Sequence, residues 1–349
     1  MTIRHLLTST ALILTTAPAF AQEELNALLW CDHADPDFLG AFEAANDVHV
    51  NVREYEGTGA ALAILEQSRP GDWDVISIDG IDVPRAHAAG ILAPLDRTNL
   101  PMDSIPEAVR LLDQQEIDGE LYGVTDKYGF NTISFDSARV DAAALQDMTA
   151  LWSGGLDARM AVYDYYLPII GMVALGVGID TADISMENLP QIREALFALK
   201  DEAEQVGEVV SSQTALATGE VDILVGGGEW ITAGLTADIP TLDWILPEQG
   251  GIFWSISMGI VAGTERPELA QAFVDYTLSP EGQAALATAE CFWAMPANAQ
   301  AGDLLSAEEK AALRWDDQAD YLARSQLYPA PDAELDAALQ DLWFEFLQR

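Results

Sequence analysis

The sequence is poor in basic residues. Its 349 residues include 16 Lys and Arg against 57 Asp and Glu, which gives a formal net charge of −41. A protein that binds nucleic acid needs a cationic surface to match the phosphate backbone, so this balance excludes that class of function. Carboxylates spread over the surface for solubility account for the charge, and a preference for cationic solutes is the functional alternative.

Residue types that carry catalysis or bind metal ions are scarce or unsuitably spaced. His33, His49 and His87 do not form a metal-binding spacing, and the sequence contains neither a G-x-S-x-G nucleophile motif nor a P-loop. No nucleophile–base pair stands out. The sequence therefore predicts no enzyme, no cofactor and no bound metal ion.

Long apolar runs are missing after the first residues of the chain. At its start, Arg4 and His5 precede the run LLTSTALILTTAPA, and small residues stand at Ala19 and Ala21. This pattern is typical of a secretory signal peptide, so we expect residues 1–21 to be removed by cleavage after Ala21. The run is shorter than the roughly 20 apolar residues that a membrane span requires. The sequence thus predicts an exported protein.

Cysteine is almost absent, with only Cys31 and Cys291 in the chain. In an exported protein an even number of cysteines suggests a disulfide, because compartments outside the cytoplasm are oxidising. Two buried free thiols are the alternative. A bridge would bring a late segment of the chain back to its start.

Strand-like and helix-like patterns alternate along the chain. We expect strands within residues 26–30, 47–55, 73–79, 221–226 and 257–263, and helices within residues 36–46, 60–68, 83–90, 191–206, 268–278, 280–289 and 333–348. This alternation predicts an α/β fold with mainly parallel sheets, in which ligands bind beyond the carboxyl ends of the strands. The chain is longer than one hydrophobic core usually serves, so we expect two domains.

Aromatic and acidic side chains gather at the expected strand ends. Asp79 ends one strand, Glu229 and Trp230 follow another, and Phe253 and Trp254 close the segment GGIFW at residues 250–254. Flat rings with a few carboxylates suit an organic cation, through cation–π attraction and ion pairing. Successive side chains of a strand face opposite ways, so only one of the two adjacent aromatic residues can enter a core.

Several segments, in order along the chain, resemble periplasmic polyamine-binding proteins, the solute receptors of spermidine/putrescine ABC importers. LLWCDHADPDFLGAFEAANDVHVNVREYEG matches their first segment, including the spacing from Trp30 to Phe42. LPEQGGIFWSISMGIVAG is similar to their P-x-E-G-G-x-x-W segment. FVDYTLSPEGQAALATAECFWAMPANAQA is similar to a late helix and the Pro-Asn turn of the same family.

The resemblance implies a two-lobed periplasmic-binding-protein fold of type II kind, whose hinge-connected lobes each hold a mainly parallel sheet and close on a solute. The first lobe would comprise residues 23–131 and 257–303, and the second residues 132–256 and 304–349. Both cysteines fall in the first lobe, which makes a disulfide between them sensible. In GGIFW, Trp254 would face the cleft, Phe253 would pack behind it, and the glycines would let solute and backbone come close.

Pocket positions of that family transfer unevenly to this chain. Trp30, Trp254 and Trp293 match aromatic positions, and Tyr128 is a further aromatic candidate. Asp32 stands at the position of an amine-contacting acid. Gly227 replaces a pocket tryptophan. The resemblance and the strand ends together give the predicted ligand-binding residues Trp30, Asp32, Asp79, Tyr128, Tyr163, Tyr166, Glu229, Trp230, Trp254 and Trp293.

One departure from the family concerns the ligand itself. Ile256 stands where polyamine-binding proteins carry an aspartate that grips an amine. Each ammonium group of a polyamine must recover its lost hydration from carboxylates or carbonyls, and a buried pair of this kind is worth about 2–5 kcal/mol. Aromatic walls in place of that aspartate favour a compact cation, methylated ones included.

The sequence thus predicts a monomeric periplasmic receptor that captures a polyamine or a related small organic amine and delivers it to an inner-membrane ABC permease. A receptor for a compact quaternary ammonium compound, such as choline, betaine or carnitine, or for a thiamine-like cation, is the alternative. Tyr165, Tyr166 and His33 suggest a ferric-ion receptor, because iron favours hard oxygen ligands. These tyrosines, however, do not follow the DILV strand, where iron receptors of this kind carry theirs.

Overall fold

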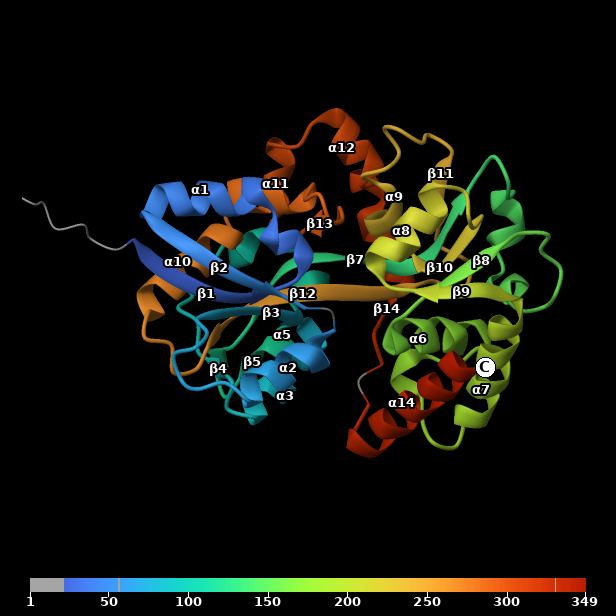
Figure 1. The fold of residues 1–349 in the computed structure, drawn as a ribbon, viewed down its shortest axis with the longest axis horizontal. Coiled ribbons are helices and arrows are strands. Elements are labelled where there is room, and N and C mark those ends of the chain that lie inside the picture. Colours follow the sequence, from blue (N-terminus) through green and yellow to red (C-terminus); the bar gives the residue numbers. More distant parts are fainter. Residues whose placement is uncertain (1–21, 56, 330) are drawn as a thin grey trace, which may run out of the picture.

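The computed structural model describes residues 22–55, 57–329 and 331–349, so the expected signal peptide lies outside the described residues. Figure 1 shows two lobes side by side, with long strands passing between them. The strands are β1 (Glu23–Leu29), β2 (Val48–Glu54), β3 (Val75–Asp79), β4 (Leu92–Ala93), β5 (Glu116–Ile117), β6 (Glu120–Leu121), β7 (Val124–Asp136), β8 (Met160–Tyr163), β9 (Ala203–Gly207), β10 (Ile223–Gly227), β11 (Leu242–Ile245), β12 (Ile252–Val261), β13 (Met295–Pro296) and β14 (Gln326–Leu327). The α-helices are α1 (Pro36–Asn46), α2 (Thr58–Glu66), α3 (Val83–Ala88), α4 (Glu107–Arg110), α5 (Leu112–Gln115), α6 (Tyr166–Gly176), α7 (Leu189–Glu202), α8 (Val209–Ala217), α9 (Glu229–Thr232), α10 (Pro267–Thr277), α11 (Pro280–Ala287), α12 (Ala307–Ala312), α13 (Gln318–Arg324) and α14 (Ala333–Gln348).

One curled sheet of 12 strands runs through both lobes, with the order β2-β1-β3-β12-β7-β10-β8-β9 along its main path. The outer pairs are parallel: β1 pairs with β2 and β3, and β8 pairs with β9 and β10. In Figure 1, α1 and α11 lie above the sheet of one lobe and α2 and α3 below it, whereas α8 and α6 take these places in the other. The α/β fold class predicted from the sequence is confirmed.

The two long strands β7 and β12 join the lobes and run antiparallel to each other and to their neighbours on the main path of the sheet, whereas the short β14 pairs with β12 in parallel. The first part of β7 pairs with β12, and its last part, from Thr132 to Phe135, pairs with β10. β12 lies between β7 and β3: residues 252–258 pair with β7, with a register shift between Ile256 and Ser257, and residues 256–260 pair with β3. The central pairs are therefore antiparallel, which the alternating pattern does not predict. The lobe limits at residues 131, 256 and 303 stay a prediction.

Local sequence explains where most helices begin and end. At α1 the Asp35 carboxylate accepts hydrogen bonds from the Asp37 and Phe38 amides, and Asp47 ends the helix in the left-handed conformation. The expected helix at residues 333–348 coincides with α14. The helix expected at residues 191–206 was wrong at its end, because Ala203–Gly207 forms β9 beside β8. Sheet pairing there overrides an amphipathic pattern that continues past Glu202.

None of the helices in the described part of the chain is both long and apolar enough to cross a bilayer.

Candidate ligand-binding site

An aromatic cavity lies where the two lobes meet around β12. Its volume is about 40 Å³. Aromatic rings form most of its wall, with one carboxylate and one amide among them. The lining residues are Trp30, Asp79, Asn131, Tyr163, Tyr165, Val209, Trp230, Trp254, Ile256, Phe292 and Tyr328. Five of the ten predicted ligand-binding residues are in this set.

Strand ends place the cavity residues, as expected for an α/β sheet. Trp30 follows the last residue of β1, and Asp79 is the last residue of β3. Tyr163 ends β8, and Trp230 lies one turn beyond β10 in α9. Four carboxyl ends from both lobes therefore converge on one small volume.

The aromatic side chains contact one another, most of them edge to face and Tyr163 with Trp230 at a tilt. The ring centroids of Tyr163 and Trp230 are 5.0 Å apart, and Phe292 lies 6.2 Å from Trp230 and 6.1 Å from Trp254 with its ring nearly perpendicular to both. Tyr165 lies 5.7 Å from Tyr328 in a similar arrangement. Such pairs hold each ring in a fixed orientation, so the walls are built before a ligand arrives.

Asp79 is the one carboxylate among the described residues that line the cavity. Its Oδ2 atom accepts a hydrogen bond from the Tyr165 hydroxyl at 2.6 Å and another from the Thr58 hydroxyl at 3.1 Å. Burial, and then the nearby charge of Asp82, raises the pKa of Asp79 to about 7. No cationic side chain of the described residues pairs with it, so a cation in the cavity would meet an uncompensated carboxylate.

Asp32, predicted to contact the ligand, does not line the cavity. It is fully buried, and its carboxylate accepts hydrogen bonds from Lys127 Nζ at 2.8 Å and pairs with His33 Nδ1 at 3.0 Å. Although burial alone would raise the pKa of Asp32, the charges of His33 and Lys127 hold it well below its usual range. Its place after β1 suggested a ligand contact, but Lys127, which lies 95 positions away in the sequence, already satisfies it.

Tyr128 and Glu229 also lie behind the cavity wall rather than in it. Tyr128 packs on Phe253, with ring centroids 5.8 Å apart, on the opposite side of β12 from Trp254. Glu229 is fully buried, and its Oε1 atom accepts the Phe130 amide at 2.9 Å. Burial raises the pKa of Glu229 to about 8, so the side chain is largely protonated at neutral pH.

Two further predicted residues line neighbouring clefts. Tyr166 faces a larger cleft of about 1240 Å³ that shares Tyr163 and Tyr165 with the aromatic cavity, and its hydroxyl donates to Asp336 at 2.6 Å. Trp293 lines a separate cleft together with Trp230. Neither residue reaches the aromatic cavity.

The two aromatic residues of the segment GGIFW face opposite sides of the strand, as expected. Trp254 lines the cavity, and Phe253 packs behind it against Tyr128 and Phe130. The expected role of the glycines was wrong. A side chain at Gly250 would collide with the carbonyl oxygen of Arg324, and one at Gly251 would collide with Leu246. These glycines therefore serve close packing of the chain on itself, not the approach of a solute.

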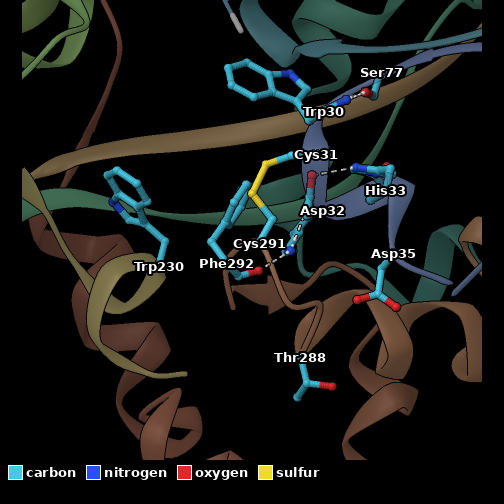
Figure 2. Close-up of polar contacts among 12 residues, drawn as sticks. Trp30, Cys31, Asp32, His33, Asp35, Ser77, Trp230, Thr288, Cys291 and Phe292 are labelled. Atoms are coloured by element: carbon cyan, nitrogen blue, oxygen red, sulfur yellow. Dashed lines mark hydrogen bonds and ion pairs between the residues drawn. A yellow bond between two sulfur atoms is a disulfide. The ribbon is translucent and has the colours of Figure 1, made fainter. Parts of the chain in front are cut away.

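The predicted disulfide between Cys31 and Cys291 is present, with 5.9 Å between the Cα atoms. Figure 2 shows how it ties two walls of the cavity, because Trp30 precedes one cysteine and Phe292 follows the other. On the Phe292 side, the carbonyl oxygen accepts a hydrogen bond from Lys127 Nζ at 3.1 Å, and the same ammonium lies 4.3 Å from the centre of the Phe292 ring. The disulfide and Lys127 thus both hold the loop that contains Cys291 and Phe292.

Sequence reasoning missed several residues of the cavity. Tyr165 was considered only as an iron ligand, Tyr328 had no strand-end signal, and Trp293 was chosen in place of its neighbour Phe292. Asn131 lies in the middle of β7, where its amide donates to the carbonyl oxygen of Gly226 at 2.9 Å. Phe292 was the one residue with a usable signal, since it is adjacent to a cysteine of the predicted bridge.

Comparison with known proteins gives a consistent result. The family model for bacterial extracellular solute-binding proteins matches residues 38–313. The chain is 26% identical over 287 residues, 80% of each chain, to the spermidine/putrescine-binding periplasmic protein of Salmonella typhimurium. It is 23% identical over 282 residues, 75% of each chain, to the putrescine/agmatine-binding protein of Pseudomonas aeruginosa. Its fold is similar to that of the spermidine/putrescine ABC transporter substrate-binding protein from Streptococcus pneumoniae, with a TM-score of 0.75 and 18% identity over 93% of this chain and 98% of the other.

Proposed function

The chain belongs to the family of bacterial extracellular solute-binding proteins, and from this membership we propose that it is the receptor of an ABC importer for a polyamine or a related small organic amine. The family is one of binding proteins and not of enzymes. The receptor would capture its ligand between the two lobes and deliver it to an inner-membrane permease. Curated relatives that bind spermidine, putrescine or agmatine support an amine as the ligand.

The aromatic cavity around Asp79 carries this proposal. A cation gains from the faces of Trp30, Trp230 and Trp254, and it neutralises a buried carboxylate that has no cationic partner among the described residues. An anion would meet the Asp79 charge without compensation, and a neutral sugar could donate hydroxyl hydrogen bonds to Asp79 but would not neutralise its charge. The remaining predicted residues Asp32, Tyr128, Tyr166, Glu229 and Trp293 would act on the ligand only indirectly.

The proposal includes the cellular setting. The receptor would be exported to the periplasm, lose residues 1–21 after Ala21, and act there as a monomer. Its lobes, residues 23–131 with 257–303 and residues 132–256 with 304–349, would close on the ligand about β7 and β12. The periplasmic relatives and the disulfide, which suits an oxidising compartment, support this setting.

A ferric-ion receptor is the less favoured alternative. The tyrosine and histidine side chains that could bind iron each form a hydrogen bond with a different acid. The Tyr165 hydroxyl donates to Asp79, the Tyr166 hydroxyl donates to Asp336, and His33 bonds to Asp126 at 2.7 Å. Within the described residues no group of three or more His, Cys, Asp or Glu side chains is arranged to hold a metal ion. The arrangement favours an organic cation over iron.

A thermal-shift screen of refolded, ligand-free protein tests the proposal. The panel contains putrescine, spermidine, choline, glycine betaine, carnitine, thiamine and ferric citrate, with a neutral sugar and an aliphatic acid as controls. A ligand at 100 times its dissociation constant adds about 2.7 kcal/mol to the free energy of unfolding, which raises the melting temperature by several degrees. Stabilisation by at least one organic cation, and not by the controls, supports the function. Stabilisation by ferric citrate or the controls alone would refute it.

A further inference from the structure

The polar side chains of the cavity are largely bonded to one another. The Tyr165 hydroxyl donates to Asp79, and the Tyr328 hydroxyl donates to Asn131 Oδ1 at 3.3 Å. The Asn131 amide nitrogen is committed to the Gly226 carbonyl oxygen. Burial keeps the pKa of both tyrosines well above the ordinary value, so their hydroxyls stay protonated and act as donors. Apart from Asp79, the acceptors that these side chains offer a ligand are therefore neutral oxygens.

The charged acceptor that remains among the described residues of the cavity is the second oxygen of Asp79. Both hydroxyl donors bond to Oδ2, and Oδ1 receives no hydrogen bond from the described residues. Two donors, by contrast, have no acceptor among the described residues: the buried indole N–H groups of Trp30 and Trp230. The cavity thus combines one open carboxylate oxygen with surplus donors and ring faces.

Ile256, the neighbour of Asp79 across the sheet, is apolar, so this position adds no second charge to the site. Ile256 on β12 is the direct antiparallel partner of Asp79 on β3, and both side chains line the cavity. Directly opposite side chains in such a pair have Cβ atoms about 5 Å apart. An acid at this position would stand beside Asp79, and the isoleucine presents an apolar surface instead.

From this inventory we infer that the ligand carries a single methylated ammonium group, of the trimethylammonium class, rather than the primary ammonium groups of a polyamine. A primary ammonium brings three N–H donors, and beside one open carboxylate oxygen the described side chains offer it neutral hydroxyl and amide oxygens that already share hydrogen bonds. A trimethylammonium group has no N–H to satisfy, and it gains from the ring faces and from the Asp79 charge. A hydroxyl or carboxylate oxygen on the ligand would accept from a tryptophan N–H. The inference rests on the proposed receptor function and names its ligand class.

Titration calorimetry with a methylation series tests this assignment on the refolded, ligand-free protein. The series is ethanolamine, N-methylethanolamine, N,N-dimethylethanolamine and choline, which share one hydroxyl and one charge and differ only in methyl groups. We expect affinity to rise at each step, with choline about tenfold or more tighter than ethanolamine, and putrescine weaker than choline.

Two variants examine the residue that sets this preference. Ile256→Asp adds a second carboxylate beside Asp79, and we expect it to shift the ratio of putrescine to choline affinity by about tenfold or more toward putrescine. Ile256→Asn changes size and polarity in the same way without the charge, and it should leave the ratio close to that of the unmodified protein. Circular dichroism melting of both variants checks that each is folded.

The outcomes separate this inference from the function on which it rests. Affinity that stays flat or falls as methyl groups are added, or putrescine tighter than choline, would overturn the ligand class and leave an organic-amine receptor standing. If no organic cation of the series or of the earlier screen binds, both the ligand class and the proposed function fail.

Discussion

Asp32 and Asp79 are two buried carboxylates at the carboxyl ends of adjacent parallel strands, and their surroundings differ. Asp32, just beyond β1, meets the charges of Lys127 and His33, which hold its pKa low. Asp79, at the end of β3, meets two hydroxyl groups and the like charge of Asp82, and burial raises its pKa to about 7. The first carboxylate is half of an ion pair with Lys127, whereas the second has no cationic partner in the part of the chain that the structure describes.

This difference separates a structural role from a binding role. A buried charge without a partner costs folding free energy, and a protein retains it only where something compensates. For Asp32 the compensation comes from within the chain, since Lys127 is fully buried beside it. For Asp79 we propose that it comes from the ligand.

The largest effect is expected from breaking the completed pair. Lys127→Met leaves Asp32 buried with only His33 as a partner, and we expect the free energy of unfolding to fall by about 3–5 kcal/mol. Chemical denaturation of the ligand-free protein measures this loss. The double variant Asp32→Asn with Lys127→Met removes both charges and should recover much of the stability. A single variant as stable as the parent would show that the pair contributes little.

Removing the charge of Asp79 should raise the stability of the ligand-free protein, whereas removing Lys127 should lower it. Asp79→Asn keeps the shape of the side chain and removes its charge, and we expect the affinity for the organic cation to fall by about 2–5 kcal/mol. Because the pKa of Asp79 is raised in the folded state, folding favours the protonated carboxyl, and the stability that this form provides is lost as pH rises through about 7. At pH 8 the Asp79→Asn variant should therefore melt at a higher temperature than the unmodified protein.

Calorimetry and melting curves of the same Asp79→Asn sample give both values. Asp32→Asn is the matched control, since it should lower stability. An Asp79→Asn variant that loses stability and keeps its affinity would contradict the contrast between the two carboxylates.

A pH series sharpens the same contrast without a mutation. Cation binding needs the charged form of Asp79, and with a pKa of about 7 only roughly 1% of it is charged at pH 5. We expect affinity for choline or putrescine, both of which stay charged over this range, to fall about 100-fold from pH 8 to pH 5. The Asp79→Asn variant should show a flat profile. A parent profile that is equally flat would assign the binding charge elsewhere.

The smallest effect is expected at Gln213, which joins the loop held by Lys127 to the opposite wall. Its side-chain amide donates to the Cys291 carbonyl oxygen at 3.1 Å and to the Trp230 carbonyl oxygen at 3.3 Å. Gln213→Leu removes both bonds at a cost of about 1 kcal/mol, so we expect ligand release to become about fivefold faster. Stopped-flow tryptophan fluorescence measures the rate. Gln213→Glu turns the donor into an acceptor, and this variant should release the ligand faster still. An unchanged rate in both variants would show that the two Gln213 hydrogen bonds do not slow release.

The sequence predicted the fold better than the electrostatics of the site. Strand ends and the alternation of Phe253 and Trp254, which depend on neighbouring positions only, placed Trp30, Asp79, Trp230 and Trp254 at the cavity, and the family resemblance added Tyr163. The partner of Asp32 could not be predicted, because Lys127 lies in a segment, TDKYGFNTISFD, whose polar residues are typical of an exposed loop and not of a buried strand. Long-range pairing alone brings the two together.

The same limit explains β9 and the glycines of GGIFW. Residues 203–207 continue an amphipathic pattern, and only the free edge of β8 makes them a strand. Gly250 is required by the backbone of Arg324, which lies 74 positions further along the chain. Local sequence patterns contain no information about such distant neighbours.

The strand order also determines when the amino-terminal lobe can fold during synthesis. β3 ends at Asp79, but its neighbour in the sheet, β12, begins only at Ile252, and the second cysteine of the bridge is 260 positions after the first. At 5–20 residues per second a ribosome needs roughly 10–50 s to supply the missing strand and cysteine. Until then the nascent lobe lacks the strand β12 beside β3 and the partner of Cys31, so it cannot complete its fold. For the export that we propose, this interval would let the chain reach a translocation channel before its first lobe can complete its sheet.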